Sequence, residues 1–370
     1  MFRKSTYILL FLFILNFIYP LAIQGMNCTA RSALLIEEKS GRILYNKNST
    51  EELPMASTTK IMTAITAIEY GDLSEQVIID DITPKIEGSS LYLKENDIIS
   101  LEDLIYGLLL QSGNDAADAV AKHVVGSEEN FITLMNEKAR MIGAVNTNFK
   151  NPHGLHDKDH YTTAKDLALI TQYAFNNDIF KEIVGTIKRE ITINNEKRVI
   201  FNKNRLVTEY EGGNGVKTGY TVDAGKCLVF SAERDDMLLV GVLIDSANIW
   251  TDSKILLDYG FNHYNLKNVL RKNEYLGSIY IDSGIMDTLK IFSNEDVAIP
   301  ISEGESIETK LNLNKNLKAP IFHHQQIGSL DFYINDNLVY QKQLFSPQKV
   351  YEKNFIKFFL ENINTYFNTI

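Results

Sequence analysis

The sequence predicts an α+β fold, in which an antiparallel sheet is flanked by helices, followed by a small all-β domain. Strand-like runs lie on both sides of a helical middle section. Near residue 187 the spacing of apolar residues changes from about 3.6 to two, the periods of a helix and a strand. After residue 272 the chain consists of short alternating runs separated by Gly, Asn and Asp, which is typical of an all-β domain.

Chain length and composition limit the class of protein. The chain has 370 residues, 45% of them hydrophobic and 23% charged, so we expect about two globular domains. A net charge of -10 and the lack of a dense Lys/Arg block disfavour nucleic-acid binding. The two cysteines, Cys28 and Cys227, suit neither a disulfide framework nor a zinc site. A single disulfide between the two is the alternative to free thiols. Cys227 lies in an apolar run, which favours a buried free thiol.

The first 25 residues have the features of a signal peptide. Arg3 and Lys4 precede an apolar stretch at 7–18, and small residues follow it. An uncleaved membrane anchor is the alternative, which the short apolar stretch disfavours. Both interpretations place the rest of the chain outside the cytoplasm.

Local patterns predict the elements of the first domain, which we assign to residues 26–268. A hairpin at 31–46 turns at Lys39-Ser40-Gly41. Helical spacing of apolar residues then recurs in five segments: 57–70, 101–110, 113–125, 128–142 and 163–176. REITI and RVIFN suggest a second hairpin around Asn194-Asn195, and VKTGYTV, KCLVFSAE and MLLVGVLI a three-stranded meander. A helix at 251–263 follows.

The end of the chain combines a β-rich domain at 272–348 with a terminal helix at 351–370. LGSIYI, TLKIFS, AIPIS, TKLNLN and SLDFYIN are the alternating runs of this domain. Apolar residues of the helix lie three or four apart: Ile356, Phe359, Ile363, Tyr366 and Ile370. An aromatic apolar face opposite a mixed polar face favours a helix that lies on a membrane surface. Docking onto the protein itself is the alternative.

The first chemical motif is Ser57-Thr58-Thr59-Lys60 at the start of a predicted helix. Residues three apart share a helix face, so Lys60 can reach the Ser57 hydroxyl. A serine becomes a nucleophile when a neighbouring base takes its proton, and burial or a second cation can make lysine that base. The motif alone is weak, because Ser57 could be a helix N-cap and the pattern recurs by chance at Ser346–Lys349.

The second motif, Ser112-Gly113-Asn114, lies between two predicted helices. A hydroxyl and an amide from a tight connection suit a proton carrier and an anchor for a substrate amide. The alternative is a capping turn in which Ser112 or Asn114 bonds the backbone of the next helix.

The third motif, Lys217-Thr218-Gly219, lies in a strand-like segment. Lys217 can bind a carboxylate and, as a neighbouring cation, lower the pKa of Lys60. Gly219 has no side chain where a substrate strand would approach. The alternative is a solvated lysine on a strand edge.

Together, and in this order, the three motifs form a specific combination. The sequence resembles the low-molecular-mass penicillin-binding proteins, the serine D-Ala-D-Ala carboxypeptidases. ASTTKIMTA, LLLQSGNDAA, NPHGL, TTAKDLA and GVKTGYTVDAGKCL extend the likeness over about residues 30–350. The resemblance implies a five-stranded antiparallel sheet flanked by helices, peptidoglycan stem peptides as substrates and β-lactams as covalent inhibitors. No cofactor or metal is expected.

The resemblance also implies roles for the matching residues of the acylation machinery. Ser57 would be the acylated nucleophile and Lys60 its base, with Ser112 as proton relay and Asn114 as substrate anchor.

Recognition of the substrate carboxylate would fall to Lys217 and Thr218. The N–H groups of Ser57 and Tyr220 would form the oxyanion hole. The family often has an arginine about thirty residues after Lys-Thr-Gly, whereas this chain reads SANIWTDSK there. We therefore expect carboxylate binding to differ from the family pattern.

Three other interpretations remain to be weighed. A class A β-lactamase would need a Glu-x-x-Leu-Asn segment between Asn114 and Lys217, and the chain has none. A catalytically silent wall-binding or sensor protein is disfavoured by the three intact motifs. The histidines of NPHGLHDKDH, at 153, 156 and 160, suggest a metal, but their spacing and the Pro and Gly among them favour a loop that lines the site.

Overall fold

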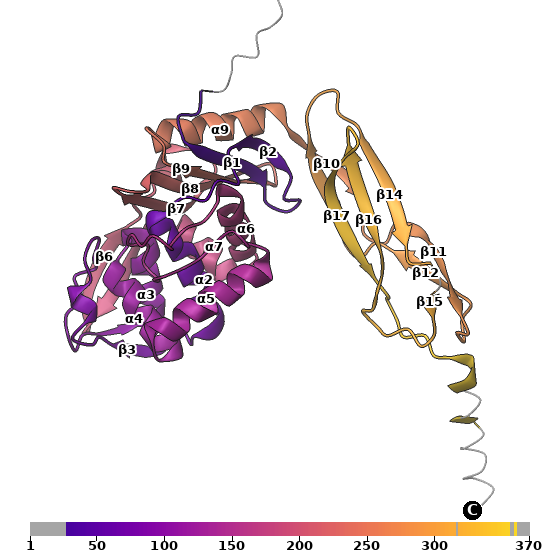
Figure 1. Ribbon diagram of the computed structural model, residues 1–370, viewed down its shortest axis with the longest axis horizontal. Helices are drawn as coiled ribbons and strands as arrows, with labels where there is room; N and C mark the ends of the chain where they lie inside the picture. Colours follow the sequence, from indigo (N-terminus) through magenta and orange to yellow (C-terminus); the bar gives the residue numbers. More distant parts are fainter. Residues whose placement is uncertain (1–26, 316, 356–358, 361–370) are drawn as a thin grey trace, which may run out of the picture.

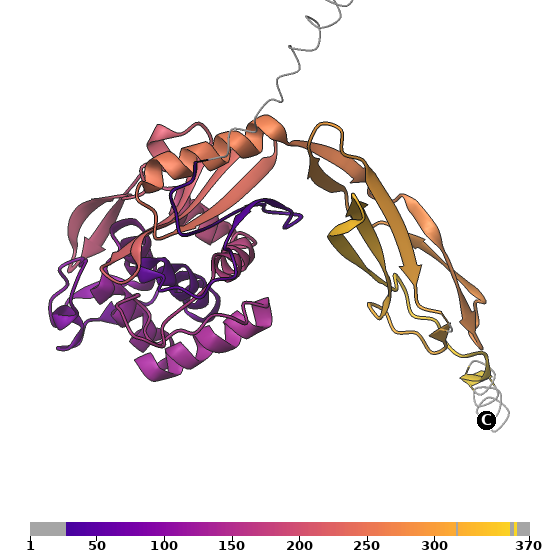
Figure 2. The same cartoon turned by 45° about the horizontal axis from the view of Figure 1, so that its top comes forward.

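The protein folds into two bodies that follow each other along the chain (Figures 1 and 2). The computed structural model describes residues 27–315, 317–355 and 359–360. The first body mixes helices and strands and ends with α9 (Ile249–His263). The second is built of strands from β10 onward, and helical residues at 353–355 and 359–360 follow it. The rest of the predicted terminal helix lies outside the described residues, apart from 351 and 352. The predicted signal peptide lies outside the described residues. Over the described ranges, no helix has the length and apolar character to cross a bilayer.

An antiparallel five-stranded sheet forms the centre of the first body, as predicted. Its strands are β1 (Ser32–Glu37), β2 (Ile43–Lys47), β7 (Gly213–Thr221), β8 (Gly225–Arg234) and β9 (Met237–Ile244). The order β2-β1-β9-β8-β7 places the first hairpin beside the last strand of the meander, with Ser32 opposite Ile244. This order leaves β7, the strand with the Lys-Thr-Gly motif, at an edge of the sheet.

Helices cover both faces of this sheet (Figure 1). They are η1 (Ala56–Thr59), α2 (Lys60–Tyr70), η2 (Thr83–Lys85), α3 (Leu101–Tyr106), the π segment η3 (Gly107–Gln111), α4 (Asn114–Val125), α5 (Glu128–Ile142), α6 (Ala164–Ala174), α7 (Asp178–Gly185), α8 (Leu206–Glu209) and α9. The face covered by α9 has its own apolar cluster, in which Leu256 and Leu257 lie with Leu35 and Leu239.

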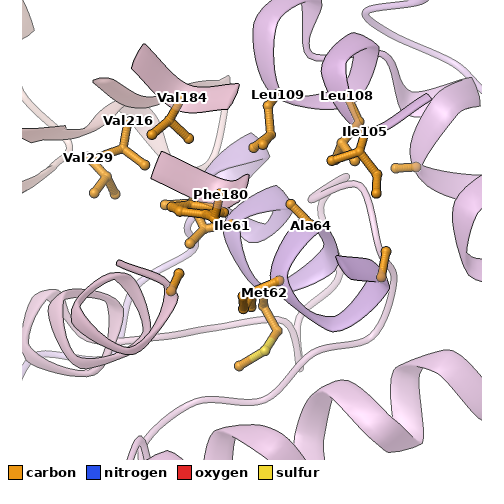
Figure 3. Packing of buried hydrophobic residues seen from close by; sticks show 14 of the residues in the cluster. Ile61, Met62, Ala64, Ile105, Leu108, Leu109, Phe180, Val184, Val216 and Val229 are labelled. Atoms are coloured by element: carbon orange, nitrogen blue, oxygen red, sulfur yellow. The ribbon is translucent and has the colours of Figure 1, made fainter. Parts of the chain in front are cut away.

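The central helix α2 is buried on all sides. Every residue from 60 to 68 is buried, which is the pattern of a helix surrounded by other elements. Ile61 lies against Phe180 of α7, and Val216 and Val229 of the sheet lie nearby (Figure 3). The Ser-x-x-Lys motif at the start of α2 is therefore held by a close-packed core.

Two parts of the first body differ from the sequence-based expectation. The REITI/RVIFN hairpin, β5 (Lys188–Ile193) and β6 (Glu196–Phe201), does not join the central sheet. It joins β3 (Gln76–Ile78) and β4 (Ile98–Ser100) in a separate sheet of order β3-β4-β5-β6. Helix α7 was not predicted, because its eight residues are too few to give a clear periodic pattern.

The second body is a β-domain whose described strands form three sheets. They are β10 (Asn265–Leu270), β11 (Tyr275–Asp282), β12 (Thr288–Phe292), β13 (Val297–Ile301), β14 (Ile307–Leu313), β15 (Leu317–Lys318), β16 (Gln326–Ile334) and β17 (Asn337–Phe345). All five predicted runs lie in strands, whereas β10, β15 and β17 were not predicted. The predicted domain limits, 26–268 and 272–348, stay a prediction, although they divide β10, which pairs with β13 of this body.

Candidate active site

Ser57 lies in the 3-10 turn η1 that leads directly into α2. The preceding residue, Ala56, has φ 49°, and no side chain caps the turn or the helix, whose N-cap residues are Met55 and Thr59. The alternative interpretation of Ser57 as an N-cap is therefore wrong. The expectation that Ser57 lies in the first α-helical turn is also corrected, because α2 begins only at Lys60.

Two glycines allow other parts of the chain to approach the peptide that carries Ser57. A Cβ on Gly154, which has φ +89°, would lie 2.0 Å from the carbonyl oxygen of Ala56. A Cβ on Gly219 of β7 would lie 3.1 Å from the Ser57 nitrogen. The NPHGL loop and strand β7 therefore fix the nucleophile from two sides.

The amine of Lys60 contacts three oxygen atoms. Its Nζ lies 3.1 Å from Ser57 Oγ, 2.7 Å from Asn114 Oδ1 and 2.5 Å from the carbonyl oxygen of His153. The side chain is fully buried. Burial, followed by the charge of Lys217, holds the pKa of Lys60 well below its usual value. Lys60 thus contacts Ser57 and has a lowered pKa, which are two properties of a general base.

The Ser112-Gly113-Asn114 motif approaches Lys60 through Asn114. Asn114 Nδ2 donates to the carbonyl oxygen of Glu87 at 2.5 Å, which turns Oδ1 toward Lys60. The N-cap of α4 is Gly113, and no side chain caps this helix. The capping-turn alternative is therefore wrong for both residues.

Ser112 differs from Asn114 in having no direct contact with the pair. It is buried, with 5% of its surface exposed, and its backbone is left-handed at φ 64°. Its predicted role as a relay stays a prediction.

Lys217 of the third motif is buried rather than solvated, which overturns the alternative of a strand-edge lysine. Only 1% of its surface is exposed, and its Nζ donates to the carbonyl oxygen of Thr218 at 3.0 Å. Burial, and then the charge of Lys203, lowers the pKa of Lys217 to about 7. Thr218 is half-buried, and Tyr220 is 65% exposed at the edge of the sheet.

The histidines of the NPHGL region support the site from behind. Lys150 N–H donates to His160 Nδ1, so Nε2 carries the proton and donates to Thr59 Oγ1 at 2.7 Å. Thr59 in turn donates to the carbonyl oxygen of Ala56 at 2.9 Å. Burial lowers the pKa of His160 to about 4, which fits a neutral ring in this chain of bonds. The loop lines the site, as the sequence predicts.

Sequence reasoning missed two features of the site. The carbonyl oxygen of His153 is one of the three partners of Lys60, and a backbone acceptor leaves no mark in the sequence. Lys203 lies close enough to lower the pKa of both Lys60 and Lys217. No motif marks Lys203 in the sequence. Its backbone N–H donates to the Leu110 carbonyl, a contact between segments that are distant in the chain.

The segment without the expected arginine has a structural role. Asn248 caps α9, and Asp252 accepts hydrogen bonds from Thr29 and Ser246. Both cysteines are free and buried, as the composition favours.

A partly exposed serine that contacts a buried lysine beside a sheet edge, followed by an all-β domain, defines a penicillin-binding type of serine enzyme. Residues 21–248 match the family described as D-alanyl-D-alanine carboxypeptidase. Residues 264–352 match the domain described as penicillin-binding protein 5, C-terminal domain. The chain therefore belongs to the D-alanyl-D-alanine carboxypeptidase family, which confirms the predicted family and its serine-peptidase activity.

Individual relatives resemble the chain over most of its length. D-alanyl-D-alanine carboxypeptidase DacF of Bacillus subtilis is 30% identical, over 89% of this chain and 88% of its own. DacC of Escherichia coli is 31% identical, over 90% and 87%. The crystal structure of penicillin-binding protein 5 from Haemophilus influenzae has a TM-score of 0.75 and 28% identity, covering 88% of this chain and 98% of that one. The predicted fold is confirmed.

Proposed function

We propose that Ser57 is the nucleophile with which this carboxypeptidase removes the terminal D-Ala from peptidoglycan stem pentapeptides. The observation that carries the proposal is the set of three contacts around Lys60 Nζ. A neutral amine has two N–H bonds and one lone pair. Asn114 Oδ1 and the His153 carbonyl accept the two N–H bonds, which leaves the lone pair for the Ser57 hydroxyl.

Acylation then follows from this arrangement. Ser57 Oγ attacks the carbonyl carbon of the penultimate D-Ala as its proton passes to Lys60. When the peptide bond breaks, the leaving D-Ala amine takes that proton back, with Ser112 as the proposed relay. Water later hydrolyses the ester and restores Ser57. Asn114 keeps Lys60 in place and offers its amide to the substrate backbone.

The substrate carboxylate has two candidate cations. Lys217 lies on β7 beside the nucleophile, and Thr218 adds a hydroxyl next to it. The charge of Lys203 lowers the pKa of both Lys60 and Lys217. Lys203 also supplies a second positive charge in a chain that lacks the family arginine. Gly219 leaves room for the substrate strand, and the N–H groups of Ser57 and Tyr220 are the proposed oxyanion donors.

β-Lactams acylate the same serine because their amide carbonyl occupies the position of the scissile bond. The chain between Asn114 and Lys217 lacks the Glu-x-x-Leu-Asn segment that a class A β-lactamase uses for deacylation. We therefore expect slow deacylation and inhibition. Rapid, repeated hydrolysis of penicillin by the purified protein would favour the β-lactamase interpretation instead.

One experiment separates an active enzyme from a silent wall-binding protein. Purified protein is incubated with a fluorescent penicillin, and in parallel with a pentapeptide that ends in D-Ala-D-Ala. The proposal predicts labelling and release of D-alanine, both lost in Ser57→Ala. Labelling without D-alanine release would favour the silent protein.

Peptidoglycan lies outside the cytoplasmic membrane, so an enzyme of this family acts there. We propose export by residues 1–25 and attachment to the outer face of the membrane by the terminal helix. Phe355, Phe359 and Leu360 support attachment, because each exposes at least half of its surface. Co-sedimentation with anionic vesicles should be lost when residues 353–370 are removed, and equal binding of both forms would refute it.

A further inference from the structure

A cleft of about 560 Å³ separates the two bodies of the protein. One wall consists of the β1–β2 turn, the end of α5 and one side of α6, and the other of the β12–β13 turn and β17. Its size lies within the range of small-molecule sites. None of its lining residues belongs to the cluster around Ser57.

The two walls are tied together by Arg42, which follows the β1–β2 turn. Its guanidinium donates to the Pro300 carbonyl and to both oxygens of Glu305, the latter at 2.7 and 2.8 Å. Only 8% of Arg42 is exposed, and it lies 5.2 Å from the ring centre of Tyr264. One guanidinium nitrogen, Nη2, bonds both carboxylate oxygens, and this largely buried contact fixes the turn relative to the β-domain.

Two adjacent carboxylates of the β1–β2 turn have different surroundings. Glu37 accepts hydrogen bonds from the N–H groups of Lys39 and Ser40 and from the Ser40 hydroxyl, so it holds the turn. Glu38 lines the cleft and is only 7% exposed. Within the described ranges, the Glu38 carboxylate makes no hydrogen bond and no ion pair, and its oxygens are not among the unpartnered polar atoms that are shut off from solvent.

Most of the Glu38 side chain is nevertheless removed from water, which disfavours its charged form. Burial raises its pKa, with Lys181 and Lys39 only partly offsetting the effect. Its backbone is well held, since its N–H donates to Leu238 and its carbonyl accepts from Gln172.

The rest of the lining suits a cation on an apolar stem. Asp296 adds a second carboxylate from the β-domain, whereas Glu295 is already paired with Lys342, and Lys39 lines the same cleft. Tyr340 contributes an aromatic ring from the β-domain, and Tyr173 one from the opposite wall, where the Lys138 ammonium already lies 5.4 Å from its ring centre. Aromatic faces attract ammonium groups, and their edges pack against methylene chains.

We propose that this cleft binds a primary ammonium group on a flexible aliphatic stem, of the kind that a lysine-like side chain or a small diamine presents, with Glu38 as its counter-ion. Such a ligand contacts both bodies at once. Its binding site is separate from the acylation site.

Isothermal titration of the full chain at low ionic strength tests the proposal with three probes. They are Nα-acetyl-lysine methylamide, its norleucine analogue without the amine, and 1,5-diaminopentane. We expect saturable binding of at least one amine and affinity at least about tenfold weaker for norleucine. Binding of only the lysine probe indicates a peptide ligand, and binding of only the diamine a small one. Binding of neither amine, or equal binding of norleucine, overturns the proposal.

Glu38→Gln should weaken amine binding by about tenfold or more, because the substitution removes the charge and keeps the shape. Glu308→Gln is the matched control, since Glu308 is exposed on β14 away from the cleft, and should bind as the unaltered chain does. Labelling of Ser57 by penicillin reports that each variant is folded.

If Glu38→Gln does not fold, Asp296→Asn on the opposite wall replaces it. Its amide oxygen can still accept from the Lys272 N–H, as the carboxylate does. We expect about two- to threefold weaker amine binding from this more solvated position. Unchanged affinity in Glu38→Gln, or in Asp296→Asn where it stands in, contradicts the proposal.

Discussion

The chain contains two Ser-x-x-Lys sequences, and their surroundings differ. Ser57 and Lys60 lie in the first body, 3.1 Å apart between Oγ and Nζ, with the lysine fully buried. Ser346 and Lys349 follow β17 in the β-domain. There the serine hydroxyl donates to the Gln348 carbonyl at 2.7 Å instead of facing a base.

The second lysine also has the wrong neighbours for catalysis. Lys349 is exposed, and its ammonium lies 4.4 Å from the ring centre of Tyr351 and 5.9 Å from that of Phe322. Aromatic faces stabilise a charged ammonium, whereas burial beside Lys217 disfavours the charge on Lys60. The comparison teaches that spacing brings two residues within reach, and that burial and neighbours decide whether they react.

The largest expected difference comes from removing each lysine. Lys60→Met should slow acylation of Ser57 by penicillin about 10³-fold or more, because the serine loses its base. Lys349→Met should leave the acylation rate unchanged. Time courses with fluorescent penicillin measure both, and equal rates in the two variants would contradict the assignment of the base.

A substitution in the NPHGL loop should disturb the packing that holds Ser57 in place. Gly154→Ala places a Cβ 2.0 Å from the Ala56 carbonyl, so we expect a loss of at least about 2 kcal/mol in stability and slower acylation. Gly304→Ala, at a similar φ of +82° in the β-domain, meets nothing within 4 Å and should cost about 1 kcal/mol, with normal acylation. Thermal unfolding and labelling rates report both, and equal effects would refute the packing argument.

Asn114→Asp places a carboxylate against the amine of Lys60. A neighbouring negative charge favours the protonated amine, so the pKa of Lys60 rises and less of the base is neutral at pH 7. We expect roughly 10²-fold slower acylation at pH 7, with partial recovery at higher pH. A rate–pH profile measures this, and slow acylation without recovery would point to loss of positioning instead.

Lys203→Met removes a positive charge that lowers the pKa of both site lysines. Without it the protonated forms are favoured, so the acidic and basic limbs of kcat/KM should both move to higher pH. Lys203→Arg keeps the charge and should leave the limbs in place. Limbs that stay unmoved in Lys203→Met would exclude Lys203 from the electrostatics of the site.

The smallest effect is expected for Ser346→Ala. Loss of its hydrogen bond to the Gln348 carbonyl should cost about 1 kcal/mol of stability. The rate of acylation should not change, which thermal unfolding and labelling together can check.

Much of the fold could be predicted because its signals are local. The Lys39-Ser40-Gly41 hairpin, the helix at 128–142 and the meander each follow from spacing and turn residues, and each is present. The separate sheet of β3 to β6 could not be predicted, since it joins segments about ninety residues apart. The change from α-helix to π-helix at Gly107 likewise has no periodic signal.

Some features of the site could likewise be predicted from the sequence, and others could not. Ser57, Lys60, Asn114 and Lys217 were identified from motifs and their order, and the structure brings them together. The His153 carbonyl was invisible in the sequence because every residue has such an oxygen. Burial, which makes Lys60 a base, comes from packing of the whole core around α2 rather than from any motif.

The most direct test of the central claim is to locate the penicillin adduct. The full chain is acylated, digested and mapped by mass spectrometry, beside Ser57→Ala and Ser346→Ala. The structure predicts one adduct, on the peptide that contains Ser57, absent in Ser57→Ala and retained in Ser346→Ala. An adduct that persists in Ser57→Ala, or that maps to Ser346, would contradict the assignment of Ser57 as the nucleophile.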